Sequence, residues 1–137
     1  MNTSGPPPHC DVLVLMCIDF RFRENVQNSL NKIGLTSYDL VVYPGASSSL
    51  SSEKHSAFRP LLDAINISQN LHGIKKVVIV DHEDCGVYGG SSSFESFDDE
   101  KTAHREKIAL ARKAIEAETG LPVEGYLAKL DGKLETI

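Results

Sequence analysis

Two short motifs place thiols, an imidazole and charged groups within a few residues of one another. Residues 17–21 (CIDFR) carry the thiol Cys17 followed by Asp19 and Arg21, and residues 82–86 (HEDCG) carry His82 and a second thiol, Cys85. Two thiols and an imidazole form a soft ligand set that suits Zn²⁺, and three protein ligands leave the fourth tetrahedral position open for water or substrate. The motifs therefore predict a catalytic zinc site at Cys17, His82 and Cys85. Asp19 and Arg21 have a spacing that would let them form an ion pair beside it.

Each motif follows a run of apolar residues that is typical of a buried strand. Residues 12–16 (VLVLM) precede the first motif, and residues 77–80 (VVIV) and Asp81 precede the second. Such nearly continuous apolar runs are typical of parallel strands that are covered on both faces. In parallel sheets of this kind, ligands bind beyond the carboxyl ends of the strands, where the strand order reverses. The pattern therefore predicts that the two motifs meet at one edge of a sheet.

The rest of the chain alternates between strand-like and helix-like periodicity. We expect strands at 11–16, 38–43, 76–80, 123–127 and 134–137 and helices at 23–33, 53–71 and 98–119. Asp131-Gly132 is a hairpin turn signal between the last two strands. Residues 47–52 and 89–97, rich in Ser and Gly, are expected to be loops. The alternation predicts a three-layer α/β fold, with a central, mostly parallel β-sheet flanked by helices and a C-terminal antiparallel edge strand.

Length, charge and cysteine usage narrow the class of protein further. The chain of 137 residues predicts a single domain at residues 10–137 after a flexible tail at 1–9. A net charge of -5 argues against nucleic acid or an anionic membrane as a partner. No apolar run approaches the ~20 residues that a bilayer span needs, and no secretory signal is visible. The odd number of cysteines, 3, is typical of a reducing compartment, so we expect a cytoplasmic protein.

The motifs and their order resemble the β-class carbonic anhydrases. The matching positions are Cys17-x-Asp19-x-Arg21 and His82-x-x-Cys85-Gly86, and residues 123–134 look like the closing hairpin of that family. The resemblance spans nearly the whole chain. It implies that Cys17, His82 and Cys85 bind Zn²⁺ and that Asp19 and Arg21 form a dyad that orients the attacking solvent. The family also shows a closed form in which the carboxylate equivalent to Asp19 ligates zinc, and the sequence leaves both arrangements open.

The implied function is that of a zinc lyase that hydrates carbon dioxide reversibly to bicarbonate by zinc-bound hydroxide. The resemblance also implies a homodimer or a higher homo-oligomer. Two alternatives stay open: a related hydrolase of carbon disulfide or carbonyl sulfide, and a non-catalytic zinc-binding homologue. The second alternative depends on residues 43–47 (YPGAS), which stand where the family commonly carries Arg-Asn-Ala-Gly. A thiol redox protein is disfavoured because Cys17 and Cys85 do not form a Cys-x-x-Cys unit.

The remaining histidines and charged residues are expected to be structural or solvated. His9 and Cys10 adjoin the predicted tail, where adventitious metal capture is a lesser alternative to solvation. His55, His72 and His104 lie in or beside predicted helices without a partner motif, so solvated or capping roles are expected. The mixed charges of the last helix predict a solvated face; they are Glu100, Lys101, Arg105, Glu106, Lys107, Arg112, Lys113 and Glu116.

Overall fold

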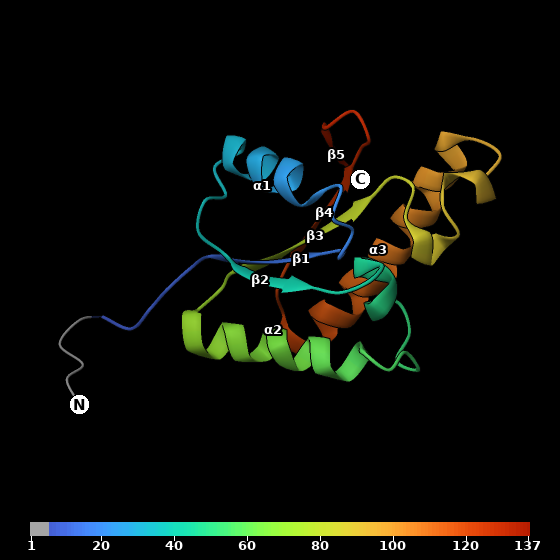
Figure 1. Ribbon diagram of the computed structural model, residues 1–137. Coiled ribbons are helices and arrows are strands. Elements are labelled where there is room, and N and C mark those ends of the chain that lie inside the picture. The colour runs from blue at the N-terminus through green and yellow to red at the C-terminus, as the bar shows by residue number, and fades with distance from the viewer. Residues whose placement is uncertain (1–5) are drawn as a thin grey trace.

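The computed structural model describes residues 6–137 as a sheet between helices (Figure 1). The five strands are β1 (Val12–Met16), β2 (Asp39–Val42), β3 (Lys76–His82), β4 (Val123–Ala128) and β5 (Leu134–Thr136). Their order in the sheet is β2-β1-β3-β4-β5. The first four strands run parallel, and β5 pairs antiparallel with β4. The predicted fold class is confirmed, including the antiparallel edge strand.

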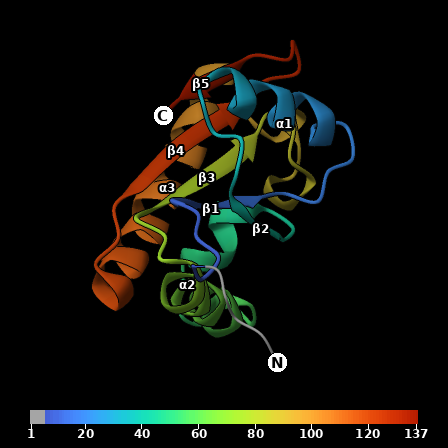
Figure 2. The ribbon, with the colours of Figure 1, turned by 90° about the vertical axis from the view of Figure 1, so that its left-hand side faces the viewer.

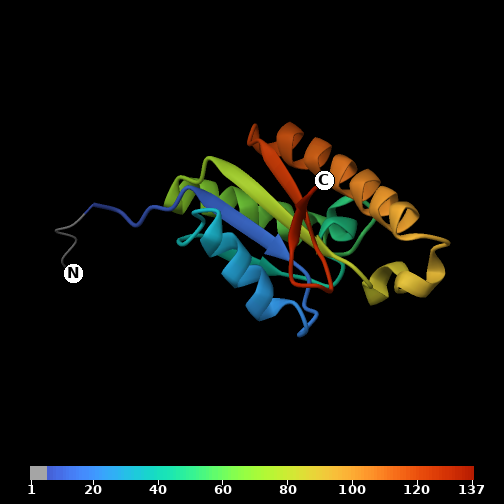
Figure 3. The ribbon, with the colours of Figure 1, turned by 90° about the horizontal axis from the view of Figure 1, so that it is seen from above.

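Helices cover both faces of the sheet and complete three layers (Figures 2 and 3). Helix α1 (Arg23–Lys32) packs on one face, and α2 (Phe58–His72) and α3 (Phe97–Thr119) pack on the other. Alternate residues of β1 enter the two cores: Val12 and Val14 join the core under α1, and Leu13 and Leu15 join the core under α2 and α3. Burial on both faces explains why the strand sequence is apolar throughout.

The strand order reverses beside β1. The chain leaves β1 through α1 to reach β2 on one side, and then returns through α2 to β3 on the other side. The carboxyl ends of β1 and β3 therefore lie next to each other, with Met16 opposite Val80 in the register. Cys17 follows β1 directly, and His82 is the last residue of β3. The topology thus places both motifs at the point where α/β sheets bind ligands.

Several connecting segments differ from the sequence-based expectations. The helix expected from residue 53 begins at Phe58, which puts Pro60 in its first turn, where the missing backbone N–H costs nothing. Residues Ala46–Leu50, which overlap the loop expected at 47–52, form a short 3₁₀ helix. Gly86–Tyr88 and Ser91–Ser93 form two more such turns, and the second of them lies inside the loop expected at 89–97. These turns line the edge of the sheet that carries the motifs.

The segment before β1 is partly anchored. Residues 1–5 of the predicted tail lie outside the described residues, and residues 6–8 are exposed. The backbone N–H of Cys10 donates to the His72 carbonyl at the end of α2, at 3.1 Å. Within residues 6–137, no helix has the length and apolar character that a membrane crossing requires.

Candidate metal centre

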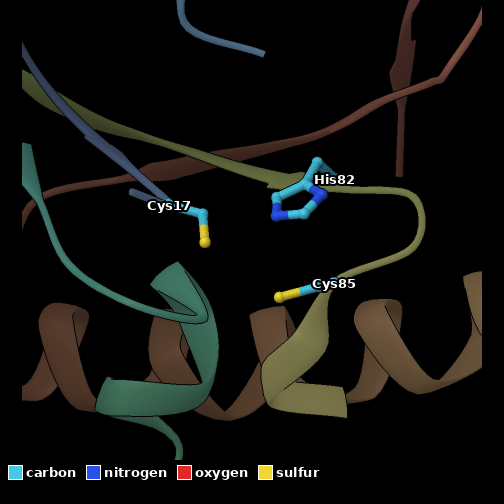
Figure 4. A group of neighbouring side chains, drawn as sticks. All are labelled: Cys17, His82 and Cys85. Atoms are coloured by element: carbon cyan, nitrogen blue, oxygen red, sulfur yellow. The ribbon is translucent and has the colours of Figure 1, made fainter. Parts of the chain in front are cut away.

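Cys17, His82 and Cys85 converge at the carboxyl edge of the sheet (Figure 4). Their ligand atoms all lie within 4.8 Å of one another. Cys17 comes from the end of β1, His82 from the end of β3, and Cys85 from the turn that follows β3. All three residues are buried, with exposed fractions of 7%, 3% and 2%. Residues 65 positions apart in sequence therefore form one compact cluster of metal-ligand type.

The imidazole of His82 is held with one nitrogen directed to this cluster. Its Nδ1 donates to the Glu83 carbonyl at 2.8 Å, which leaves Nε2 as the ligand atom. Nε2 is buried and has no hydrogen-bond partner among the described residues. A buried nitrogen of this kind is costly unless something binds it. The unpartnered Nε2 beside two sulfur atoms fits a zinc ion, for which imidazole and thiolate are common ligands.

The two thiols are arranged to hold negative charge. The Gly45 backbone N–H points at Cys17 Sγ at 3.3 Å. Hydrogen bonding from Cys85, and then from His82 and Gly45, lowers the pKa of Cys17, while the neighbouring Cys17 and burial raise the pKa of Cys85. In the metal-free protein the pair therefore keeps one proton between two sulfur atoms. A divalent cation would replace that proton and stabilise both thiolates.

Arg21 joins both motifs through its guanidinium group. Its Nη2 and Nε donate to the Asp19 carboxylate at 2.7 and 3.1 Å, and its Nη1 donates to Asp84 Oδ2 at 3.0 Å. Arg21 lowers the pKa of Asp19 to about 2, so this carboxylate is ionised at neutral pH. Asp19 Oδ2 lies 3.8 Å from His82 Nε2, at the rim of the cluster. The geometry brings Asp19 and Arg21 together as expected and adds Asp84, which the sequence analysis did not identify.

The turn between His82 and Cys85 is held by the second carboxylate. Asp84 adopts a positive φ of 62°, an uncommon conformation for a residue other than glycine. Its backbone N–H donates to Glu100 Oε2 at 2.6 Å, and its Oδ1 accepts from the Ser91 N–H at 2.8 Å. Glu100 is only 2% exposed, so its assignment to a solvated helix face was wrong. A helix position with mixed-charge neighbours gave no sign that this carboxylate binds a distant loop.

A polar network lies behind the cluster and involves Asp81, which precedes His82. The Asp81 carboxylate accepts from the Ser47 hydroxyl at 2.6 Å, the Ser47 N–H at 3.1 Å and His104 Nδ1 at 2.7 Å. Tyr88 stacks on His104 with ring centroids 4.0 Å apart. His104 is fully buried, so the expectation of a solvated or capping role was wrong for it. The expectation was correct for His55, whose Nδ1 accepts from the Ala57 N–H before α2.

The loop that differs from the resembled family contributes directly to the site. Gly45 has a φ of 79°, and a Cβ there would lie 2.8 Å from Val87 Cγ1. Its N–H binds Cys17 Sγ, and Ser47 two residues later binds Asp81. The sequence Gly45-Ala46-Ser47 therefore has a clear structural purpose in this chain, which is to join the end of β1 to the end of β3.

A cavity of about 420 Å³ opens onto the cluster. Apart from the three cluster residues and Asp19, its walls are apolar or carry no side chain: Ile18, Phe20, Pro44, Gly86 and Val87. The cavity thus has polar groups at its base and apolar groups around them. This arrangement suits a small substrate that offers few hydrogen-bonding groups.

Comparison with known proteins agrees with the fold. Residues 8–137 match a family model described as "putative carbonic anhydrase". Uncharacterized proteins of Rickettsia bellii and Rickettsia conorii are each 34% identical over 131 residues, or 91% of this chain, and the match covers 80% and 70% of their lengths. A crystal structure of β-carbonic anhydrase isoform I from Trichomonas vaginalis superposes with a TM-score of 0.61 at 18% identity, over 100% of this chain and 87% of that one. The chain belongs to the putative carbonic anhydrase family and is a divergent member with the β-carbonic anhydrase fold.

Proposed function

We propose that the protein is a zinc-dependent carbonic anhydrase that interconverts carbon dioxide and bicarbonate. The observation that carries this proposal is the buried cluster of Cys17, His82 and Cys85, with an unpartnered Nε2 at the base of an apolar cavity. Membership of the family supports the same reaction. The three cluster residues would hold the metal, and Asp19 and Arg21 would act on the substrate side.

The donor set fits Zn²⁺, and each neighbouring residue has a defined task. When bound, Zn²⁺ lowers the pKa of a water molecule toward neutrality and thereby supplies a nucleophile for carbon dioxide. Asp19 is ionised, so it accepts a hydrogen bond from solvent entering the site and orients that solvent toward the substrate. Arg21 fixes the Asp19 carboxylate through two nitrogens, a bidentate geometry that lysine cannot provide.

The apolar cavity holds the substrate next to these groups. Ile18, Phe20 and Val87 line it together with the cluster residues and Asp19, so an apolar substrate would contact these side chains beside the polar groups. Carbon disulfide and carbonyl sulfide share the linear shape of carbon dioxide and would fit the same walls. Assaying the three compounds on the same protein is therefore needed to identify the substrate.

The decisive experiment is stopped-flow hydration of carbon dioxide on protein whose zinc content is measured. We expect catalysed hydration that is lost when a chelator removes zinc and restored when zinc is added. Hydrolysis of carbon disulfide or carbonyl sulfide without hydration of carbon dioxide would mean that one of those two compounds is the substrate in place of carbon dioxide. A folded, zinc-loaded protein that turns over none of the three compounds would favour a non-catalytic zinc-binding homologue.

We also propose a homodimer or higher homo-oligomer in a reducing, cytoplasmic setting. Large apolar side chains stay exposed at the mouth of the cavity, with exposed fractions of 87% for Phe20, 60% for Ile18 and 52% for Val87. Clustered exposed apolar groups favour association. All three cysteines are free, which suits a reducing compartment. Light scattering should give the mass of at least two chains, and Phe20→Asp should lower it; an active monomer at every concentration would contradict the proposal.

A further inference from the structure

A second cluster of metal-ligand type lies at the opposite edge of the sheet. The ligand atoms of Cys10, Asp39 and His72 all lie within 4.8 Å of one another. Cys10 precedes β1, Asp39 begins β2, and His72 ends α2. The two clusters are therefore separated by the length of β1, and they share no residue.

The backbone fixes the three residues relative to one another. The Cys10 N–H binds the His72 carbonyl at 3.1 Å, and Asp39 pairs with Leu13 in the register between β2 and β1. Helix α2 ends directly after His72, where Gly73 adopts a left-handed conformation. A strand start, a helix end and the segment before β1 thus meet at one point, and none of the three ligands depends on a long loop.

Hydrogen bonds to Asp39 show how the cluster is balanced without a metal. Asp39 Oδ2 accepts from the Ser68 hydroxyl at 2.6 Å and from His72 Nδ1 at 2.7 Å. These bonds, first that of Ser68 and then that of His72, lower the pKa of Asp39, so its carboxylate is charged at neutral pH. The Cys10 thiol donates to the Val12 carbonyl at 3.6 Å. Asp39 thus carries one negative charge, and a bound cation could replace the His72 Nδ1 proton that faces it.

We propose that Cys10, Asp39 and His72 form a second divalent-cation site, selective for Zn²⁺ and similar borderline metals. A thiolate, an imidazole and a carboxylate are all zinc ligands, with bonds of about 2.0–2.3 Å. On binding, the Cys10 thiol loses its proton to solvent, and His72 presents Nδ1 as its remaining proton moves to Nε2. The charges of Zn²⁺, thiolate and carboxylate then sum to zero. Ser68 remains hydrogen-bonded to Asp39, as outer-shell partners of metal-binding carboxylates commonly are.

The surroundings predict a weaker and more exchangeable site than the one at the carboxyl edge. The side chains of His72 and Asp39 are 34% and 29% exposed, and a cavity of about 170 Å³ reaches them from solvent. His9 lines the same cavity, but its Nε2 is bonded to Asp11 at 2.8 Å, so we expect water as the fourth ligand. Bound metal would join the segment before β1 to the end of α2. This role is a structural brace, because the site has no apolar substrate pocket like that of the first cluster.

Zinc titration of the full-length, metal-free protein tests the site by counting. We expect about two equivalents per chain, one of which a mild chelator removes first. Cys10→Ser and His72→Gln should each bind one equivalent fewer, while His55→Gln, a histidine outside both clusters, should bind two. Equal stoichiometry in wild type, Cys10→Ser and His72→Gln would overturn the proposal. The count does not depend on whether the protein hydrates carbon dioxide.

The absorption spectrum of the cobalt-substituted protein tests independently whether Cys10 is the sulfur ligand. In a Cys17→Ser, Cys85→Ser variant, the only remaining thiol is Cys10, and we expect a thiolate-to-cobalt charge-transfer band that is lost when Cys10→Ser is added. Absence of that band in the folded double variant would contradict the site. If the double variant does not fold, the zinc count on the single variants decides the question alone.

Discussion

The two ends of β1 carry clusters with similar ligand chemistry, but the clusters differ in burial and in the hydrogen bonds of their ligand atoms. At the carboxyl edge the three ligand residues are buried, and His82 Nε2 has no hydrogen-bond partner among the described residues. At the amino edge the Asp39 and His72 side chains are about one-third exposed and are hydrogen-bonded to each other. When the first cluster binds a cation, the unpartnered His82 Nε2 gains a partner. The second cluster must instead give up the hydrogen bond between His72 and Asp39 to bind a cation. Burial and the lack of a partner therefore predict the higher affinity at the carboxyl edge.

The supports of the two clusters, meaning the neighbouring residues that hold the ligand residues by hydrogen bonds, are also more numerous at the carboxyl edge. At the carboxyl edge Arg21 binds Asp19 and Asp84, and the buried Asp81 anchors Ser47 and His104 behind the ligands. At the amino edge, Ser68 is the outer partner that the structure shows for Asp39. A site that performs chemistry needs ligands and neighbours held in fixed positions. The denser support is thus consistent with catalysis at the carboxyl edge and with a bracing role at the amino edge.

Loss of a ligand at the carboxyl edge should have the largest effect. His82→Gln should remove the metal from this cluster and lower carbon dioxide hydration by more than ~100-fold, since outer-shell changes alone cost roughly 10–100-fold. His55→Gln is the matched control and should stay within about twofold in rate. Stopped-flow rates and zinc content on the same samples measure both effects. Full activity in a zinc-free His82→Gln protein would remove this cluster from the mechanism.

Arg21→Ala should have the next largest effect, and it separates metal binding from the later steps. Arg21 contacts Asp19 and Asp84 and none of the three cluster residues by a hydrogen bond, so zinc content should be retained. Turnover should fall by roughly 10–100-fold because Asp19 loses its orientation. Arg23→Ala, an exposed arginine two residues later, is the control. Zinc loss as large as in His82→Gln would show that Arg21 acts by holding the ligand turn.

Changes in the supports should affect stability more than rate. His104→Ala leaves the buried Asp81 carboxylate without one donor and should lower the free energy of unfolding by about 3 kcal/mol. Ser68→Ala at the amino edge removes one donor from a partly exposed carboxylate and should cost about 1 kcal/mol. Arg105→Ala on the exposed side of α3 should stay within about 0.5 kcal/mol. Urea unfolding measures all three; equal costs for His104→Ala and Ser68→Ala would contradict the difference in support.

The elements of the fold were predictable because their signals are local. Apolar runs at 12–16 and 77–80 specify buried strands, and Gly73 and Gly120 follow the helices that they end. The start of α2 was predicted five residues too early, although Pro60 in the first turn is a local signal that marks the start at Phe58. The carboxyl-edge cluster was predictable for the same reason: each motif follows a strand, and strand ends in a parallel sheet meet.

The supporting contacts were not predictable, because they join residues without a shared pattern. Glu100 and His104 looked like ordinary positions on a charged helix, and only the packing of α3 against the site turns them toward Asp84 and Asp81. The amino-edge cluster was missed because His72 and Cys10 were each considered alone. They lie close to Asp39 only because α2 ends where β2 begins, and the spacing of these residues in the sequence does not predict that arrangement.

The smallest expected effects are in the titration of the Asp19 and Asp39 carboxylates. They test whether a change at one edge of the sheet affects the carboxylate at the other edge. Asp19 has its pKa lowered to about 2 by Arg21, and Asp39 has its pKa lowered mainly by Ser68. A depressed folded-state pKa stabilises the protein above the unfolded value of about 3.9, and that stability is lost as the pH falls through the folded value. The gain is small because both side chains are partly exposed.

Carbon-detected NMR of the carboxyl groups follows each titration separately in the metal-free protein. Arg21→Ala should move the Asp19 midpoint up toward about 3.9 and leave Asp39 unchanged, whereas Ser68→Ala should raise the Asp39 midpoint alone. If either variant moved both carboxylates, the two ends of β1 would be coupled through the strand. The separate treatment of the two clusters would then have to be replaced by a single network.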